Sequence, residues 1–443
     1  MKTKPKKYLI FTGDQRIPIE SDPYIYLGFN QNKIDINKTM KEMEIIQPSA
    51  LNSKGFYSFL PRGQLMSELI QDFITNYLEN TLNAFQIKTP FIYKLTGEEK
   101  HLRLFEDRVY SVRSPNNEFF LLKPNADLGL FHICASAQIN KDSLPLRIYE
   151  KTPCCRYVLS GELAGIKKAR EFLLFDHHSL CADEKSALNE YFEILKKQKT
   201  IQKIFSKKYI EWFKIPENLL SKYEEAILVH KEKNDIIVIE LVPEKRLYWE
   251  IKSFSTNEDG DRLFHLQFDH DNPRSYGINY SDSDQLKPCV IIHNSLGTIE
   301  RWLMLLIKDS LKKPVPVLPL WLSPTQVRIL PLKDANIPEA IALAKEIKSY
   351  KIRVDVDDRS ETLGNKIRNA EKEWIPYTIV FGDKEIANKE ILPIRQRGVG
   401  QFSSSLENLI TKIKTEVGEM PYKSLPNWLL SKKLIFTKKI KEK

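Results

Sequence analysis

Short β-branched runs alternate with helix-spaced apolar residues in the last third of the chain, and this alternation restricts the fold there. The runs are Val327 to Leu330, Ile352 to Val356 and Tyr377 to Phe381, and the helix-spaced segments are Ile337 to Tyr350 and Glu361 to Trp374. Strands alternating with helices in this order are typical of α/β folds. The sequence therefore predicts a compact α/β module in this region.

Three prolines separate this module from the preceding residues. Pro314, Pro316 and Pro319 stand just before Trp321. Proline cannot continue a helix and stiffens a connection, so we predict a domain boundary here. The predicted domains are a short N-terminal extension over 1–46, a separate unit over 47–318, and the α/β module with a basic tail over 319–443.

Composition sets wider limits. The 443 residues are 42% hydrophobic, enough for a sizeable core and two or three domains. Lys and Arg number 68 against 58 Asp and Glu, and the net charge of +10 suits a polyanionic partner. Five cysteines without regular spacing favour a reducing compartment over a disulfide framework. The first apolar run ends at Gly13-Asp14, too early for a signal peptide or membrane span, so we expect a cytoplasmic protein that binds no membrane.

Several segments before the prolines have their own patterns. In the extension, residues 8–11 and 23–27 predict two strands. The first of the later segments is a helix-spaced run from Gln64 to Phe85, followed by a strand from Ile87 to Ile92. The second, within Leu144 to Cys181, predicts two strands joined by a loop. The third is a strand from Val290 to His293 that leads into Gly297-Thr298-Ile299-Glu300-Arg301-Trp302.

These later segments resemble motifs 1, 2 and 3 of class II aminoacyl-tRNA synthetases, and Trp321 to about Arg397 resembles their anticodon-binding domain. The resemblance is to threonyl-tRNA synthetases of archaeal type. It implies an α+β catalytic domain, with an antiparallel sheet flanked by helices, followed by an α/β anticodon-binding domain. It also implies a homodimer formed through motif 1. The segment before Gln47 is too short for the editing domain of many members, so we expect none there.

The resemblance also implies ligase chemistry with ATP and Mg²⁺. An amino-acid carboxylate attacks the α-phosphate of ATP, and preorganised cations must meet the charge that develops. Arg156 matches the motif 2 arginine on the α-phosphate, and Arg301 matches the motif 3 arginine on the γ-phosphate. Lys168 and Arg170 would hold the triphosphate, and Phe172 would stack on adenine.

A metal site is implied with one departure. In the family, zinc held by one cysteine and two histidines binds the amino and hydroxyl groups of threonine. His178 and His293 match the histidines, but the cysteine position holds Asp127. Zinc accepts carboxylate ligands, so either zinc is retained by these three residues or Asp127 meets a substrate ammonium directly. His177 points to the opposite face of its strand from His178, so at most one of them reaches the site.

The amino-acid pocket is also assigned by resemblance. Its matching residues are Asp127, Asp176, Tyr248 and Gln267. Strand alternation places His265, Gln267 and Asp269 on one face, which we expect to point inward.

In the C-terminal module, five residues are candidates for contact with tRNA. Lys366, Arg368 and Lys372 would present cations to phosphates. Arg359 or Tyr377 would stack on, or hydrogen-bond to, an unpaired base. For any one lysine alone, a solvated helix face is the alternative.

Val158 is a second departure, because a glutamate normally stands two residues after the motif 2 arginine. Losing a charged hydrogen-bond partner costs about 1.5–3 kcal/mol. The first hypothesis is a ligase that attaches threonine to tRNA(Thr). The alternatives are a catalytically weak tRNA-binding paralogue, or the same chemistry with a different amino acid.

Overall fold

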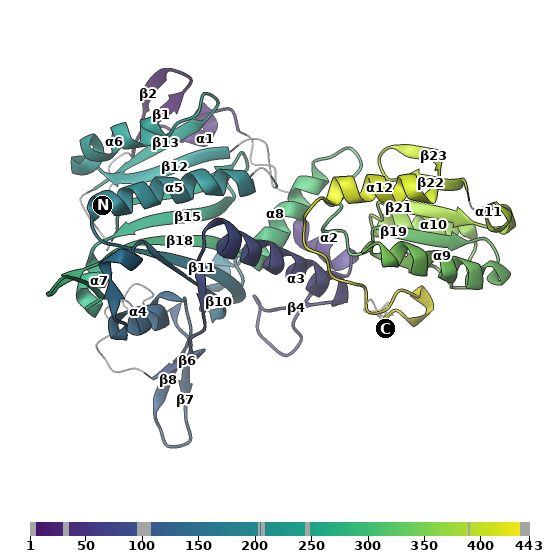
Figure 1. Cartoon of the computed structure of the whole chain (residues 1–443), viewed down its shortest axis with the longest axis horizontal. Helices are drawn as coiled ribbons and strands as arrows, with labels where there is room; N and C mark the ends of the chain where they lie inside the picture. Colours follow the sequence, from purple (N-terminus) through teal and green to yellow (C-terminus); the bar gives the residue numbers. More distant parts are fainter. Residues whose placement is uncertain are drawn as a thin grey trace. The chain divides into compact units, whose positions relative to one another are not determined.

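The computed structural model describes residues 6–29, 35–94, 108–202, 204, 209–243, 249–388 and 390–434 (Figure 1). The chain forms two compact units, one within 1–34 and 74–302 and the other within 35–73 and 303–443. The domain boundary predicted between 318 and 319 stays a prediction; the units divide the chain nearby, after Trp302. No described helix is long and apolar enough to cross a lipid bilayer.

A ten-stranded sheet forms the frame of the first unit. In spatial order its strands are β2 (Gln15–Ile19), β1 (Lys7–Thr12), β13 (Ile236–Val242), β12 (Tyr209–Pro216), β14 (Trp249–Asn257), β15 (Arg262–Asp269), β18 (Val290–Thr298), β11 (Glu171–Cys181), β10 (Leu146–Cys155) and β5 (Phe85–Ile87). All neighbours pair antiparallel except β12 with β13 and β5 with β10. The paired strands β10 and β11 and the passage from β18 into α8 (Ile299–Leu311) confirm the elements predicted for these segments.

The two faces of this sheet differ in chemistry. One face packs apolar side chains, including Phe213, Leu266 and Ile292, against α5 (Glu184–Gln202) and α6 (Leu220–Val229). In Figure 1 both helices lie over the sheet. Because side chains alternate along a strand, the intervening residues point to the opposite face. That face carries the polar and charged residues described below.

Smaller elements complete the first unit. They are α1 (Pro23–Tyr26), the π-helical turn η1 (Tyr77–Thr81), β6 (Ile92–Lys94), β7 (Ser111–Arg113), β8 (Phe119–Leu122), α4 (Asp127–Ser136), β9 (Ile139–Asn140), η4 (Lys141–Ser143), η5 (Ser160–Glu162), η6 (Glu217–Leu219), α7 (Asp271–Tyr276), β16 (Asn279–Asp282) and β17 (Gln285–Pro288). Strands β6, β8 and β7 form one small sheet, and β17, β16 and β9 form another.

The N-terminal strands were predicted only in part. Residues 8–11 lie in β1, as expected, but 23–27 are not a strand. The Asp22 side chain accepts a hydrogen bond from the Tyr24 amide, and Pro23 stands at the first helical position, so the segment starts the short helix α1. The second predicted strand is wrong because this capping outweighs β-propensity.

The predicted helix and strand before residue 92 are also displaced. Helix α3 (Pro61–Asn76) continues into η1, and the strand that follows is β5, earlier than the predicted Ile87 to Ile92. Thr89 and Pro90 lie between β5 and β6, where proline cannot supply a ladder hydrogen bond.

The second unit contains the predicted α/β module. Its sheet has the order β20 (Val354–Val356), β19 (Val327–Pro331), β21 (Tyr377–Phe381), β22 (Leu392–Gln396) and β23 (Gly400–Ser404). The first three strands are parallel, and helices α9 (Ile337–Ser349), α10 (Leu363–Lys372) and α12 (Leu406–Val417) belong to this module. The unit also contains α2 (Ile36–Glu42), β3 (Ile46–Pro48), β4 (Tyr57–Phe59), the start of α3, η7 (Asp334–Asn336), α11 (Asp383–Ala387) and η8 (Leu430–Lys432). The predicted fold class is therefore confirmed.

A buried ion pair holds the segment that leads into α4. The Lys123 ammonium lies 2.7 Å from Glu150 Oε1 on β10, and both side chains are fully buried. Lys123 Nζ also donates to the hydroxyls of Thr89 and Thr152, at 2.6 and 3.1 Å. The network joins three segments of the chain close to Asp127.

We predict that Lys123→Met destabilises the protein, because it leaves the buried Glu150 carboxylate without its cation. The free energy of unfolding, measured in urea, should fall by about 3–5 kcal/mol. Combining Lys123→Met with Glu150→Gln removes both charges and should recover a large part of that loss. A change below about 0.5 kcal/mol in the single variant would contradict the assigned role.

Candidate active site

A cavity of about 550 Å³ opens on the polar face of the ten-stranded sheet. Strand register aligns Lys252 on β14 with Gln267 on β15, Gln267 with His293 on β18, and His293 with His178 on β11. These four residues therefore form one cross-strand row. Eight predicted site residues line the cavity: Asp127, Arg156, Lys168, Phe172, Asp176, Gln267, His293 and Arg301.

Three cations give the cavity a strong attraction for anions. The Arg156 guanidinium donates from Nε to the Pro124 carbonyl at 2.7 Å and lies over the Phe172 ring, 5.2 Å from its centroid. Arg301 Nε is buried and has no hydrogen-bond partner among the described residues. Burial lowers the pKa of Arg301, and so does the charge of Arg262. Lys252 adds the third positive charge, so a bound anion would relieve repulsion between like charges.

The two other cations predicted to bind ATP differ in accessibility. Lys168 is half-exposed and pairs with Glu162 at 3.0 Å, a surface contact that a phosphate can replace at little cost. The Arg170 guanidinium is buried, lies over the Tyr157 ring and donates from Nε and Nη2 to the Val158 carbonyl at 3.0 and 2.7 Å. Arg170 is not among the residues that line the cavity, and in this structure it holds the backbone of the loop.

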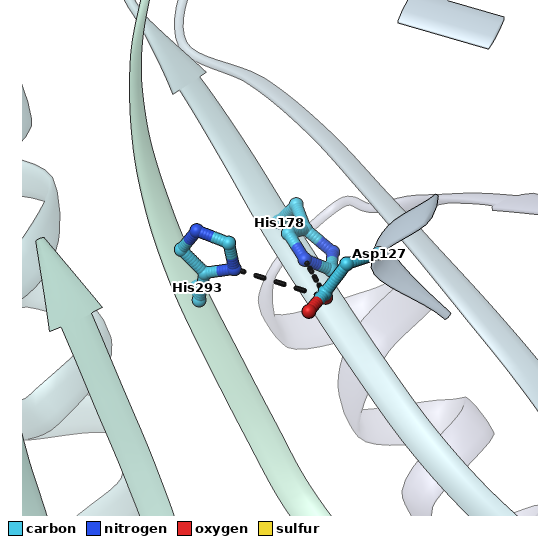
Figure 2. Close-up of side chains that lie close together, drawn as sticks. All are labelled: Asp127, His178 and His293. Carbon is cyan, nitrogen blue, oxygen red and sulfur yellow. Dashed lines mark hydrogen bonds and ion pairs between the residues drawn. The ribbon is translucent and has the colours of Figure 1, made fainter. Parts of the chain in front are cut away.

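Asp127, His178 and His293 converge on one another, as Figure 2 shows, and Asp127 and His293 line the same cavity as these cations. His178 Nε2 lies 2.9 Å from Asp127 Oδ1, and His293 Nδ1 lies 3.8 Å from the same oxygen. All three side chains are buried, and their potential ligand atoms lie within 4.8 Å of one another. His177 lies on the opposite face, where Asn294 Nδ2 is 3.3 Å from its Nδ1, which confirms the predicted alternation.

This donor set fits a divalent metal ion. Two imidazole nitrogens and one carboxylate oxygen, with room left for a substrate, are the ligands of many catalytic zinc sites. The second nitrogen of His293 lies 2.7 Å from Asp269 Oδ2, the outer hydrogen bond typical of metal-binding histidines. The same atoms are also arranged to accept hydrogen bonds from an ammonium group.

The carboxylates strongly affect titration in the cluster. Burial lowers the pKa of His293, but Asp127 and Asp269 outweigh it and raise the pKa to about 10. Burial raises the pKa of Asp176 to about 6, and the charge of Asp127 adds to this increase. A cation bound here would therefore compete with protons.

Lys252 and Trp249 also line the cavity, although the sequence did not single them out. They stand three residues apart, so a regular strand would point them to opposite faces. The pairing of β14 with β15 shifts between Trp249 and Lys252, and this irregularity brings both side chains to the cavity. No residue pattern marked the irregularity. Tyr248, predicted for the same pocket, lies outside the described residues.

The residues predicted to contact tRNA are in two different environments. Lys366 is buried and donates to the Pro331 carbonyl at 3.1 Å, and Tyr377 is 1% exposed within the module's core. In this structure they are core residues, which corrects their expected exposure to RNA. Arg368 and Lys372 are exposed on α10, whereas Arg359 is half-buried and forms a two-point ion pair with Asp357.

Comparison with known families identifies two domains. Residues 110–310 match the family described as tRNA synthetase class II core domain (G, H, P, S and T). Residues 326–416 match the family described as anticodon binding domain. The two matches bear out the class II core and the anticodon-binding domain that the resemblance implied.

Curated relatives are threonine–tRNA ligases of archaea. The chain is 31% identical to that of Methanosphaera stadtmanae over 416 residues, which cover 90% of this chain and 67% of the relative. It is 30% identical to that of Methanocaldococcus jannaschii, with 88% and 66% covered. The chain thus spans about two thirds of the length of these relatives.

Solved structures share the fold at lower identity. The crystal structure of the RNA binding domain of threonyl-tRNA synthetase from Cryptosporidium parvum superposes with a TM-score of 0.74 at 20% identity, covering 88% of this chain and 99% of that one. Prolyl-tRNA synthetase from the same organism, complexed with L-proline and AMP, gives a TM-score of 0.68 at 17% identity, covering 87% and 75%.

We predict that Lys252 reacts with amine reagents at unusually low pH. Burial, together with the charges of Arg262 and Lys214, lowers the pKa of Lys252 to about 8. Acetylation of the Lys252 peptide, followed by mass spectrometry between pH 6 and 11, should rise with a midpoint near 8, against about 10.4 for an unperturbed lysine. Bound ATP should suppress the reaction. A midpoint above about 10 would contradict the assigned environment.

Proposed function

We propose that this chain, which belongs to the threonine–tRNA ligase family of class II aminoacyl-tRNA synthetases, activates threonine with ATP and transfers it to tRNA. The observation that carries the proposal is the composition of one cavity. It holds the cations Arg156, Lys252 and Arg301 together with the acidic residues Asp127 and Asp176. An amino acid and ATP together present an ammonium, a carboxylate and a triphosphate, which match those charges.

In the first step, a carboxylate oxygen of threonine attacks the α-phosphorus of ATP, and pyrophosphate leaves with the electron pair of the broken P–O bond. Arg156 would bridge the two anions as they meet, and Arg301 would bind the γ-phosphate. Mg²⁺ accompanies the ATP. Fixed cations in a buried cavity stabilise the developing charge without reorganisation, which is the main source of catalysis in such a step. In the second step, a ribose hydroxyl of tRNA attacks the acyl carbon, and AMP leaves.

Asp127, His178 and His293 would hold a zinc ion. As a Lewis acid, zinc would bind the amino and side-chain hydroxyl groups of threonine and distinguish it from an amino acid of the same shape without a hydroxyl. Asp176 and Gln267 line the same cavity and would orient the ammonium. A buried site built for a hydroxyl rejects an analogue that leaves its polar groups unpaired.

A tRNA and a second copy of the chain complete the proposal. Arg368 and Lys372 are exposed on one helix and would contact phosphates. For the homodimer, β5 is the edge strand of the ten-stranded sheet, and Phe85 on it is 66% exposed. An exposed edge strand that carries a large apolar side chain is a natural pairing surface.

Val158 favours a second candidate function, a tRNA-binding paralogue with weak catalysis. Its apolar side chain lines the cavity where the family pattern has a glutamate. A valine side chain can neither donate nor accept a hydrogen bond, so one polar contact to the substrates would be missing.

We predict that Arg156→Ala lowers threonine-dependent ATP–pyrophosphate exchange by about a hundredfold or more, because a preorganised charge is lost from the transition state. Binding of tRNA, measured by filter retention, should be unchanged. Arg113→Ala, at an exposed arginine outside the cavity, is the matched control and should retain full exchange.

The amino-acid dependence of exchange separates the candidate functions. Exchange that requires threonine, together with tRNA charging, supports the ligase. Exchange with another amino acid indicates the same chemistry on a different substrate. Undetectable exchange with all standard amino acids, alongside retained tRNA binding, supports the paralogue, and unaltered exchange in Arg156→Ala contradicts the role of that arginine.

We also predict that Arg368→Ala and Lys372→Ala each weaken tRNA binding and reduce its salt dependence. Each lost phosphate contact should lower the slope of log affinity against log salt concentration by about 1. Lys345→Ala, at an exposed lysine on α9 outside the proposed interface, should leave the slope unchanged. Equal slopes in all three variants would remove α10 from the interface.

A further inference from the structure

We propose that Asp269 is a positioning residue that holds a proton of His293 on Nε2, so that Nδ1 is the nitrogen whose lone pair binds a metal ion beside Asp127 and His178. This inference rests on the metal site in the proposed function. It assigns a role to a residue that is not itself a metal ligand. With Nε2 protonated, only Nδ1 of the ring is left to bind the ion.

The hydrogen bonds of Asp269 show that its carboxylate accepts a hydrogen bond from His293. It is fully buried at the end of β15, and its Oδ2 lies 2.7 Å from His293 Nε2. Its Oδ1 accepts the backbone N–H groups of Asp271 and Asn272 at 2.9 and 3.0 Å. The Asn272 amide donates to Oδ2 at 2.7 Å. An ionised carboxylate only accepts hydrogen bonds, so Nε2 of His293 must be the donor.

The opposite nitrogen of the ring then has a defined chemistry. A neutral imidazole with its proton on Nε2 has a lone pair on Nδ1. Nδ1 of His293 lies 3.8 Å from Asp127 Oδ1 and faces the cluster (Figure 2). The charge of Asp269 also makes this lone pair more basic and so a stronger ligand.

His178 has no equivalent support. Its Nδ1 is buried and has no hydrogen-bond partner among the described residues, and its Nε2 lies 2.9 Å from Asp127, which is itself a proposed ligand. Of the two histidines, only His293 is therefore prearranged by an outer carboxylate. Asp269 also contacts the first turn of α7, so the position of the histidine is tied to the backbone that follows β15.

Replacing the carboxylate by an amide tests this argument directly. In Asp269→Asn, the one carbonyl oxygen is needed by the two N–H groups of α7, which turns the amide NH₂ toward His293. Nε2 must then accept, the ring proton moves to Nδ1, and a protonated Nδ1 cannot bind a metal ion. If the amide turns the other way, its NH₂ faces the N–H groups of Asp271 and Asn272, and these donors are left without an acceptor. The substitution keeps the shape of the side chain but reverses the required tautomer.

The experiment measures zinc affinity of the full chain by competition with a chromophoric chelator. Asp269→Asn and Asp269→Ala should bind zinc tenfold to a hundredfold more weakly, with Asn at least as weak as Ala. Glu211→Gln is the control, because Glu211 is an equally buried carboxylate bonded to Gln202 and Ser255, away from the cluster. It should bind zinc as the unaltered protein does.

A second measurement does not depend on the Asp269 variants folding. Nitrogen-15 NMR of histidine-labelled, zinc-loaded protein should show metal at Nδ1 and a proton at Nε2 of His293, identified by the signal missing in His293→Gln. The reverse tautomer would overturn the inference, as would unchanged zinc affinity in both Asp269 variants. If the unaltered protein binds no zinc, the inference and the metal site both fall. Threonine-dependent exchange in the same preparation then shows whether the ligase proposal survives.

Discussion

The register of the ten-stranded sheet is the constraint on which the site depends. The row from Lys252 through Gln267 and His293 to His178 comes from four different strands, and only their pairing aligns it. A slip of one residue would turn every side chain of a strand to the other face. Such a slip would expose Leu266 and Phe268, which are buried against the helices, so apolar packing on one face fixes the polar chemistry on the other.

That arrangement brings together charges that repel one another. Arg301 is half-buried beside other cations, and burial and like charge lower its pKa. Burial and the like charge of Asp127 raise the pKa of Asp176 in the same way. Groups held in this way destabilise the unliganded cavity. Ligands of the opposite sign remove the repulsion, so part of the folding energy supplied by the apolar face becomes affinity for substrates. A cavity with both signs selects a ligand, or a pair of ligands, that also carries both.

The sequence predicted the elements whose signals are local. Strand and helix periods marked the α/β module, and alternation placed Gln267 and Asp269 on one face of β15. Periodicity did not identify Arg156 or Arg301; the resemblance to a known family did. Features that depend on three-dimensional context were missed: the irregular pairing that turns both Trp249 and Lys252 inward, and the capping of α1.

The same limit explains Lys366 and Tyr377. Spacing places a lysine on a helix and a tyrosine in a strand, but neither pattern reports that the Pro331 carbonyl lies in reach of the ammonium, or that the ring packs in the core. Polar side chains with apolar stems are often buried along the stem, so residue type alone does not determine exposure. Arg368 and Lys372 are on the same helix as Lys366 and remain exposed.

Asp127 can serve a metal ion or an ammonium group, and its surroundings favour the metal. The Asn125 amide donates to Oδ2 at 2.5 Å, and Oδ1 lies toward the two histidines. Oδ1 is therefore the carboxylate oxygen nearest to both imidazoles, and it carries negative charge as a thiolate would. An ammonium group can also donate to an oriented lone pair, but a histidine ring oriented by an outer carboxylate is the arrangement typical of metal ligands. The hydrogen bond from His293 to Asp269 supplies that orientation, which is why this outer contact, more than Asp127 itself, favours metal binding.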